Sequence, residues 1–179
     1  SAANYTASLS CTGNATALSG NTLTVNASDT AITCTETNTR KSATLILRKT
    51  WVDGKVNDAV TVTATGLTGL ASVADTANET DADAGQAVYA GDAITLGESF
   101  TIGSSANYTA ALACSGNAVA LAGNTLTVDP ADTSITCTLT NARKTATLTL
   151  RKSWVNAHVN DAVQVNATGL PAFASTANT

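Results

Sequence analysis

The chain has 179 residues, a net charge of −4 at pH 7 and few aromatic residues, and Ser and Thr together account for 47 positions. The acidic balance and the lack of a Lys/Arg cluster argue against nucleic acid as a partner. Membrane insertion is not expected either, because no apolar run approaches the roughly 18 residues that a membrane span requires. Thr and Val suit a pleated, half-buried surface, so the composition predicts short β-strands joined by polar turns and almost no helix.

The chain is a tandem repeat. When it is shifted by 103 residues against itself, 51 of the 76 overlapping positions are identical, and no gap is needed. A period of this length is the size of a domain. We interpret residues 42–144 as one complete repeat, residues 1–41 as the C-terminal part of a preceding repeat, and residues 145–179 as the N-terminal part of a following one. Neither partial repeat can bury a whole core alone, so the chain is interpreted as a window cut from a longer repetitive fibre. The two partial repeats could complete each other between molecules.

The first strand of the complete repeat is predicted at residues 43–52. Its side chains alternate, so that Leu45, Leu47, Lys49 and Trp51 share one face. A lysine on an apolar face requires an explanation, because burying an ammonium group without a partner is costly.

Residues 75–85 are polar and acidic and are predicted to form a loop. Further strands are expected at residues 60–64, 70–73, 86–89, 93–102, 107–115, 126–128 and 134–141. The alternation in these strands places Glu98 and Asn141 on the same inward side as Lys49. Short strands at this spacing predict an all-β chain of antiparallel sandwich modules.

The four cysteines do not match a CxxC redox motif or a zinc site, and the single histidine, His158, adds no set of metal ligands. Two pairs, each separated by 23 positions, are instead typical of disulfides in an exported protein: Cys11–Cys34 and Cys114–Cys137. The alternative is four free, buried thiols. We expect no cofactor.

Three segments together resemble the B-type repeat of collagen adhesins and pilins of Gram-positive bacteria. They are residues 47–53, 94–98 and 135–141. The resemblance spans the whole repeat and implies a prealbumin-like (inverse immunoglobulin) Ig-like sandwich. In that family a lysine of the first strand and an asparagine of the last strand form an isopeptide bond, which a glutamate between them promotes. The matching residues here are Lys49, Asn141 and Glu98.

A dry core would lower the pKa of the lysine. A neutral Lys49 amine could then attack the carboxamide carbon of Asn141, while protonated Glu98 polarises the oxygen and ammonia leaves. This bond would close a loop of about 90 residues, which the entropy model for crosslinks values at roughly 4–5 kcal/mol. The alternative is that Lys49 reaches solvent or pairs with Glu98, and that Asn141 caps the end of its strand. The copy of Leu139 is Glu36, so the last strand differs between repeats.

Asp81 and Asp83 are a candidate for calcium, because Asp81-x-Asp83-x-Gly85 is similar to half of a calcium-binding loop. The segment has no third ligand at the required spacing and no closing glutamate. A solvated turn is the alternative interpretation.

These features predict a structural stalk or fibre module of a secreted bacterial cell-surface protein, stiffened by crosslinks, with further copies of the repeat as its partners. The alternative is an adhesin module that binds a host or matrix component. The two repeats differ chiefly at turns, such as residues 53–55 against 156–158, which favours the stalk. We expect no enzyme acting on an external substrate; the only chemistry would be one turnover of self-crosslinking.

Overall fold

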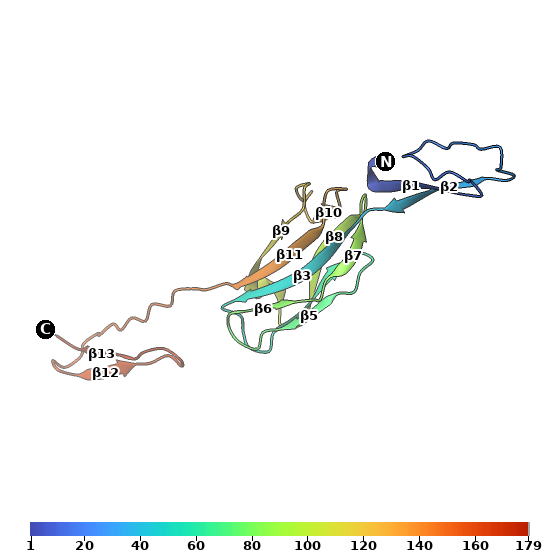
Figure 1. The fold of residues 1–179 in the computed structure, drawn as a ribbon. Helices are drawn as coiled ribbons and strands as arrows, with labels where there is room; N and C mark the ends of the chain where they lie inside the picture. Colours follow the sequence, from blue (N-terminus) through green and yellow to red (C-terminus); the bar gives the residue numbers. More distant parts are fainter. Residues whose placement is uncertain (179) are drawn as a thin grey trace. The chain divides into compact units, whose positions relative to one another are not determined.

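The computed structural model of the protein describes residues 1–178 and is an all-β structure, as the sequence predicts. Its only helical elements in that range are two short 3₁₀ helices, η1 (Ala2–Asn4) and η2 (Ser105–Asn107). The chain divides into two compact units, Ser1–Lys144 and the residues from Thr145 onward (Figure 1). Among the residues described, no helix has the length and apolar character needed to cross a membrane.

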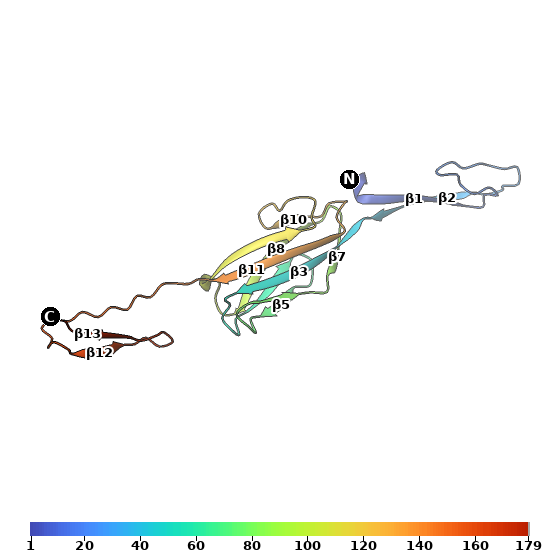
Figure 2. The same cartoon turned by 60° about the vertical axis from the view of Figure 1, so that its left-hand side comes forward.

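The complete repeat forms two β-sheets (Figure 2). Its strands are β3 (Ser42–Val52), β4 (Ala59–Ala64), β5 (Leu70–Val73), β6 (Glu79–Ala82), β7 (Gln86–Tyr89), β8 (Ala93–Ile102), β9 (Tyr108–Ser115), β10 (Thr125–Thr127) and β11 (Ser134–Arg143). One sheet has the order β10-β8-β4-β5, and the other has the order β6-β3-β11-β9, with β7 also paired to β3.

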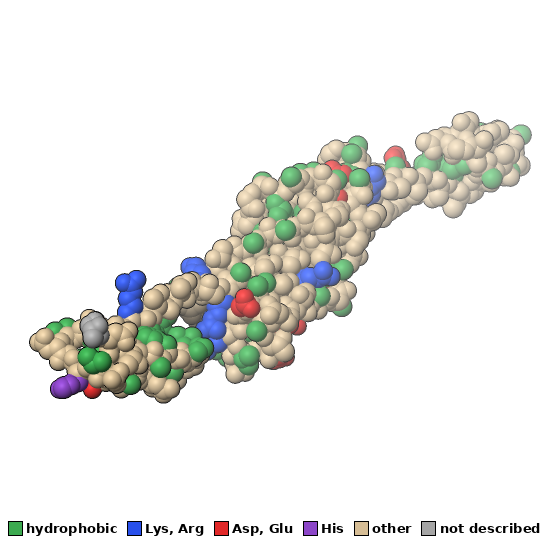
Figure 3. Space-filling model, turned by 90° about the vertical axis from the view of Figure 1, so that its left-hand side faces the viewer, with side chains coloured by type: hydrophobic (Ala, Val, Ile, Leu, Met, Phe, Trp, Pro, Cys, Tyr) green, Lys and Arg blue, Asp and Glu red, His purple; other side chains and the backbone are tan. Residues whose placement is uncertain are grey.

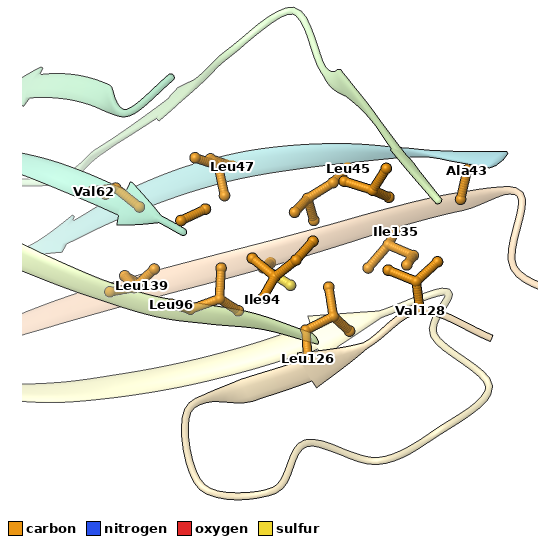
Figure 4. Packing of buried hydrophobic residues seen from close by; sticks show 13 residues of the cluster. Ala43, Leu45, Leu47, Val62, Ile94, Leu96, Leu126, Val128, Ile135 and Leu139 are labelled. Carbon is orange, nitrogen blue, oxygen red and sulfur yellow. The ribbon is translucent and has the colours of Figure 1, made fainter. Parts of the chain in front are cut away.

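The hydrophobic core lies between these two sheets (Figure 4). Every second residue of β3 is buried, as the predicted alternation requires. The fully buried side chains Leu45 and Leu47 of one sheet face Val62 and Leu96 of the other. Fully burying an aliphatic side chain contributes about 1.5–3 kcal/mol, so this cluster supplies most of the driving force for folding.

The first and last strands of the complete repeat pair in parallel. Ser134 lies opposite Thr44 and Ala142 lies opposite Val52. The sequence predicts an antiparallel sandwich, and every other named strand pair in this unit is antiparallel. Because β3 and β11 run in the same direction, the chain enters the repeat at one end and leaves it at the other. The two ends are about 30 Å apart along the strands.

One predicted loop contains a strand. Within residues 75–85, β6 pairs with the outer edge of β3, from Arg48 opposite Ala82 to Trp51 opposite Glu79. The pairing uses backbone groups on an edge strand whose side chains remain largely exposed. A strand of this kind needs no apolar residues, which explains why the polar composition of the segment hides it.

The two partial repeats form hairpins. In the first unit, β1 (Tyr5–Thr12) pairs with β2 (Thr33–Arg40), and in the second, β12 (Ala162–Val165) pairs with β13 (Phe173–Thr176). Nearly every residue of β2 is exposed, whereas its copy β11 alternates between buried and partly exposed positions. Residues 145–154 form no strand, although their copy is β3.

Arg40, at the end of β2, contacts the turn between β7 and β8. Its Nη2 lies 2.7 Å from Asp92 Oδ1, and its Nε donates a hydrogen bond of 3.0 Å to the carbonyl of Ala90. The guanidinium group also lies over the ring of Tyr89, 5.6 Å from the centroid. These contacts join the end of the first hairpin to the β7–β8 turn, which lies beside the beginning of β3.

Candidate functional site

A lysine lies in the core of the complete repeat. Lys49 is 0% exposed and follows Leu47 and precedes Trp51 on the inward face of β3. The sequence predicts this position from the alternation of β3 alone, and the structure shows no route by which the ammonium group reaches solvent. Burying a charged group of this kind requires a partner.

That partner is Glu98, from the facing sheet. Lys49 Nζ donates a hydrogen bond of 2.8 Å to Glu98 Oε2, and it lies 4.7 Å from the centre of a Trp51 ring. Burial lowers the pKa of the Lys49 ammonium group below its ordinary value of 10.5, and the hydrogen bond and negative charge of Glu98 oppose this shift. The pKa of Lys49 is lowered overall, which raises the share of the neutral amine at a given pH. The neutral amine is the nucleophilic form.

Asn141 is the third buried polar residue. Its side chain is 0% exposed, and neither Oδ1 nor Nδ2 has a hydrogen-bond partner among the residues that the structure describes. A buried amide without partners destabilises a folded protein by about 1–3 kcal/mol per unsatisfied group. Such groups are rare in native structures and require an explanation.

The strand register places the amide next to the lysine. In the parallel pair of β3 and β11, Leu139 lies opposite Lys49, and Asn141 lies opposite Trp51. All four side chains point inward, so Lys49 and Asn141 are diagonal neighbours on one face of the sheet, within reach of a long side chain. Glu98 approaches from β8 on the other sheet. The structure therefore brings together the three residues that the sequence singles out.

A shallow hollow of about 270 Å³ lies beside Glu98. Its lining consists of Leu96, Gly97, Glu98, Ala110, Ala111, Leu112, Asn124 and Leu139. The Glu98 side chain retains 12% exposure here, while that of Lys49 has none. The Glu98 side chain thus borders solvent on one side, while the Lys49 side chain is fully enclosed.

This arrangement has the parts of an amide-forming reaction. The Lys49 amine is the nucleophile, the Asn141 carboxamide is the electrophile, and Glu98 can accept a proton from the amine and donate it to the departing nitrogen. A bond between Lys49 Nζ and Asn141 Cγ would form as the bond between Cγ and Nδ2 breaks, and ammonia would leave. The substrate of such a reaction would be the protein itself, and one turnover would exhaust it.

The structure contains the two cysteine pairs expected from the sequence. Cys114 is bonded to Cys137 between the adjacent strands β9 and β11, and Cys11 is bonded to Cys34 between β1 and β2. No free cysteine remains in residues 1–178. Two disulfides suggest an oxidising, extracellular environment.

Asp81 and Asp83, the calcium candidates, are not brought together with further ligands. Asp83 Oδ1 accepts hydrogen bonds of 3.0 Å from the backbone N–H groups of Leu47 and Gly85, and its Oδ2 accepts one of 3.1 Å from Gln86. Asp81 lies on β6, opposite Lys49 in the backbone register. The Asp83 carboxylate ties the chain after β6 to β3, and we find no cluster of metal ligands in residues 1–178.

Sequence reasoning missed a second buried polar group. Tyr108 donates a hydrogen bond of 2.6 Å from its hydroxyl to Asp58 Oδ2 and accepts one of 3.0 Å from the backbone N–H of Lys55. Burial raises the pKa of Tyr108, and the hydrogen bond to Asp58 adds to this shift. The sequence signal for this pair was its recurrence: Tyr108 recurs as Tyr5 in the preceding partial repeat, and Asp58 recurs as Asp161 in the following one.

The lysine recurs in the second unit without its two partners. Lys152 Nζ lies 4.2 Å from the centre of a Trp154 ring, and Trp154 Nε1 donates a hydrogen bond of 3.0 Å to Ser175. In the complete repeat Trp51 donates the same bond to Ser72. Within the described part of the second unit, Lys152 donates only to the carbonyl of Ser153.

Comparison of the chain with protein-family models, with curated proteins and with solved structures finds no match in any of the three.

Proposed function

We propose that the chain is part of a structural stalk or fibre of a secreted bacterial surface protein, built from tandem prealbumin-like, Ig-like repeats. The repeat would act as a spacer that transmits pulling force without unfolding. The observation that carries this proposal is the parallel pairing of β3 with β11, which places the two ends of the complete repeat at opposite ends of the sheet. Repeats connected in this way extend a fibre instead of folding back on it.

The same pairing determines how force acts on the repeat. A pull on its two ends slides β3 against β11 along their length, so the hydrogen bonds between the strands are loaded together. A bond between Lys49 and Asn141 would join these two strands directly. Force would then pass from β3 into β11 through the side chains, and the residues between positions 49 and 141 would carry none of it.

Mechanical unfolding of the single chain tests this proposal. Lys49 and Asn141 are separated by 92 positions, and the Cys114–Cys137 disulfide shortens this path by 23. Without the isopeptide bond, unfolding should extend about 69 residues between Lys49 and Asn141, which lengthens the chain by about 230–250 Å. The native chain should show no such extension, because the crosslink holds that segment closed.

The matched control is Asn141→Ala, which removes the electrophile and leaves the pair of Lys49 with Glu98 in place. This variant should show the full extension in each trace. The same extension in the native chain would contradict the proposal that a Lys49–Asn141 bond shields the repeat from force.

A further inference from the structure

One of the few ion pairs in this chain lies between the hairpin of β1 and β2 and the complete repeat. Charged side chains are sparse on the face of the molecule in Figure 3, and only 9 residues of the chain are Lys or Arg. Residues 1–178 contain two ion pairs. One joins Lys49 to Glu98 in the core. The other joins Arg40 to Asp92 at the boundary between the repeats, and the proposed crosslink does not use it.

The linker at this boundary is a single residue, Lys41, between Arg40 at the end of β2 and Ser42 at the start of β3. Its backbone N–H donates a hydrogen bond of 2.9 Å to the carbonyl of Asn4, directly before β1. Its own carbonyl accepts a hydrogen bond of 3.0 Å from the N–H of Ala90 in the complete repeat. Each backbone group of the linker is therefore bonded on a different side of the boundary. A linker of this length and bonding cannot act as a flexible tether.

The turn between β7 and β8 provides a fixed surface for the hairpin. The Asp92 N–H donates a hydrogen bond of 2.9 Å to the carbonyl of Tyr89, and the Tyr89 N–H donates one of 2.9 Å to Asp92 Oδ2. Two more backbone bonds join the turn to Val128, one from the Gly91 N–H to its carbonyl and one from its N–H to the carbonyl of Asp92. Because Oδ2 is held within the turn, Oδ1 is positioned to accept the hydrogen bond from Arg40.

Arg40 binds this turn in three ways at once. It pairs with Asp92, donates a hydrogen bond to the carbonyl of Ala90, and lies over the ring of Tyr89. A partly exposed ion pair contributes little to stability by itself. The guanidinium group is planar, however, and it can make these three contacts together in only one orientation. The contacts therefore specify an angle between the hairpin and the complete repeat.

A glycine in the turn allows the hairpin to approach closely. Gly91 has a φ of 88°, and a Cβ atom at this position would lie 2.6 Å from Asn4 Nδ2 and 3.7 Å from Arg40 Nη2. Any other residue would therefore place its side chain in the space that the preceding repeat occupies. This close approach is independent of the ion pair, and both observations indicate a surface shaped for the end of a repeat.

We propose that the β7–β8 turn is the docking surface for the end of the preceding repeat, and that Arg40 fixes the angle between consecutive repeats. The docking residues of the hairpin recur in the complete repeat, as Asn107, Arg143 and Lys144. The Lys144 N–H donates a hydrogen bond of 2.9 Å to the carbonyl of Asn107, which is the bond that Lys41 makes with Asn4.

The end of the complete repeat thus has the local geometry with which the hairpin docks. In a tandem chain each repeat would hold the next one at the same angle. The inference rests on the proposed function, because a fixed angle between repeats is what a stalk requires in order to project or connect other parts.

Pulsed electron paramagnetic resonance on the full-length chain tests the fixed angle. Spin labels at two exposed positions, on Ser8→Cys in β1 and Ala71→Cys in β5, report the distance across the boundary while the native disulfides stay closed. The otherwise native chain should give one narrow distance distribution. Arg40→Gln should broaden it several-fold, because glutamine carries no charge and lacks the planar fork of donors. A distribution that is broad before this substitution, or that stays narrow after it, would overturn the proposal.

Two matched controls accompany this measurement. Arg143→Gln is the same change in the copy of Arg40, which forms no ion pair within residues 1–178, and it should leave the distribution narrow. Gly91→Ala should shift or broaden the distribution, whereas Gly66→Ala should not. Both glycines have a positive φ, so alanine strains both turns, but a Cβ atom at Gly66 has no atom within 4 Å. Equal effects within either pair of variants would contradict the docking surface.

The same samples separate this inference from the proposed function. Neither Arg40 nor Gly91 contacts Lys49 or Asn141, so closure of the crosslink can be measured by mass in every labelled sample. A narrow distribution without closure would remove the isopeptide bond and leave the fixed angle. Closure with a broad distribution would remove only the fixed angle.

Discussion

Lys49 Nζ lies 2.8 Å from Glu98 Oε2 in a core where the lysine side chain is 0% exposed and the glutamate side chain is 12% exposed. In the proposed reaction, this difference in exposure would suit the two groups to different roles. The amine is held dry with a lowered pKa, and the carboxylate keeps contact with solvent. Asn141, the adjacent amide, has no hydrogen-bond partner in residues 1–178, and a bond to Lys49 would explain why this position tolerates a buried amide.

Glu98→Gln should leave the repeat folded but prevent rapid closure. Glutamine preserves the size of the side chain and can accept a hydrogen bond, but it cannot relay a proton from the amine to the leaving nitrogen. General acid–base catalysis of this type contributes about 100-fold or more. The fraction of closed chain, followed by intact mass over time after purification, measures the effect.

The control for this experiment is Asp53→Asn, because the other copy of the repeat has Asn156 at this position. It removes a carboxylate from the surface of the same repeat and should close as fast as the native chain. If Glu98→Gln closes at the native rate, Glu98 has no part in the chemistry.

Asn141→Asp should form the same bond with a different leaving group. A protonated carboxyl group at this position can react with the Lys49 amine to give the same amide with release of water. The mass of the closed chain should then be about 18 Da below that of the open variant, instead of about 17 Da for ammonia. An unchanged mass in this variant, with the native chain closed, would show that the amide nitrogen is required.

The open variant Asn141→Ala should become more stable as the pH rises towards 10.5. The pKa of Lys49 is lowered in the folded state, so between that value and 10.5 the unfolded chain binds more protons than the folded one. The contribution of Lys49 to the free energy of unfolding is therefore lowest at a pH where Lys49 is protonated in both the folded and the unfolded chain. It increases with pH across this window. Chemical denaturation between about pH 7 and about pH 9.5 measures the slope.

The matched control for the pH experiment is the double variant Lys49→Met with Asn141→Ala. Without the buried amine, this increase in stability should be absent over the same pH range. Equal slopes in the two variants would show that Lys49 is not the group responsible.

Tyr108→Phe should destabilise the complete repeat by about 1–3 kcal/mol, because it leaves the buried Asp58 carboxylate without its short hydrogen bond. For a domain of this size, such a loss corresponds to a fall in Tm of several degrees. The control Tyr5→Phe alters the exposed copy and should change the Tm little. Equal shifts in calorimetry would contradict a specific role for the pair of Tyr108 and Asp58.

Much of the site was predictable from the sequence because strand alternation is a local property. Positions 49, 98 and 141 each fall in phase with apolar neighbours, and the repeat identifies which residues recur. The parallel register of β3 and β11 could not be predicted, since pairing between the ends of a repeat depends on the whole sandwich. β6 was missed because its polar side chains contribute little to the core, and the partnership of Tyr108 with Asp58 was missed because the two lie 50 positions apart.

The mass of the reduced, full-length chain is the most direct test of the Lys49–Asn141 bond. We expect a mass about 17 Da below that of the sequence, corresponding to one ammonia. Trypsin should cleave after Arg48 but not after the modified Lys49. The peptide that begins with Lys49 should remain joined to the peptide that contains Asn141. A mass equal to that of the sequence, with normal cleavage after Lys49, would show that the three buried residues form only a hydrogen-bonded pair and an unsatisfied amide.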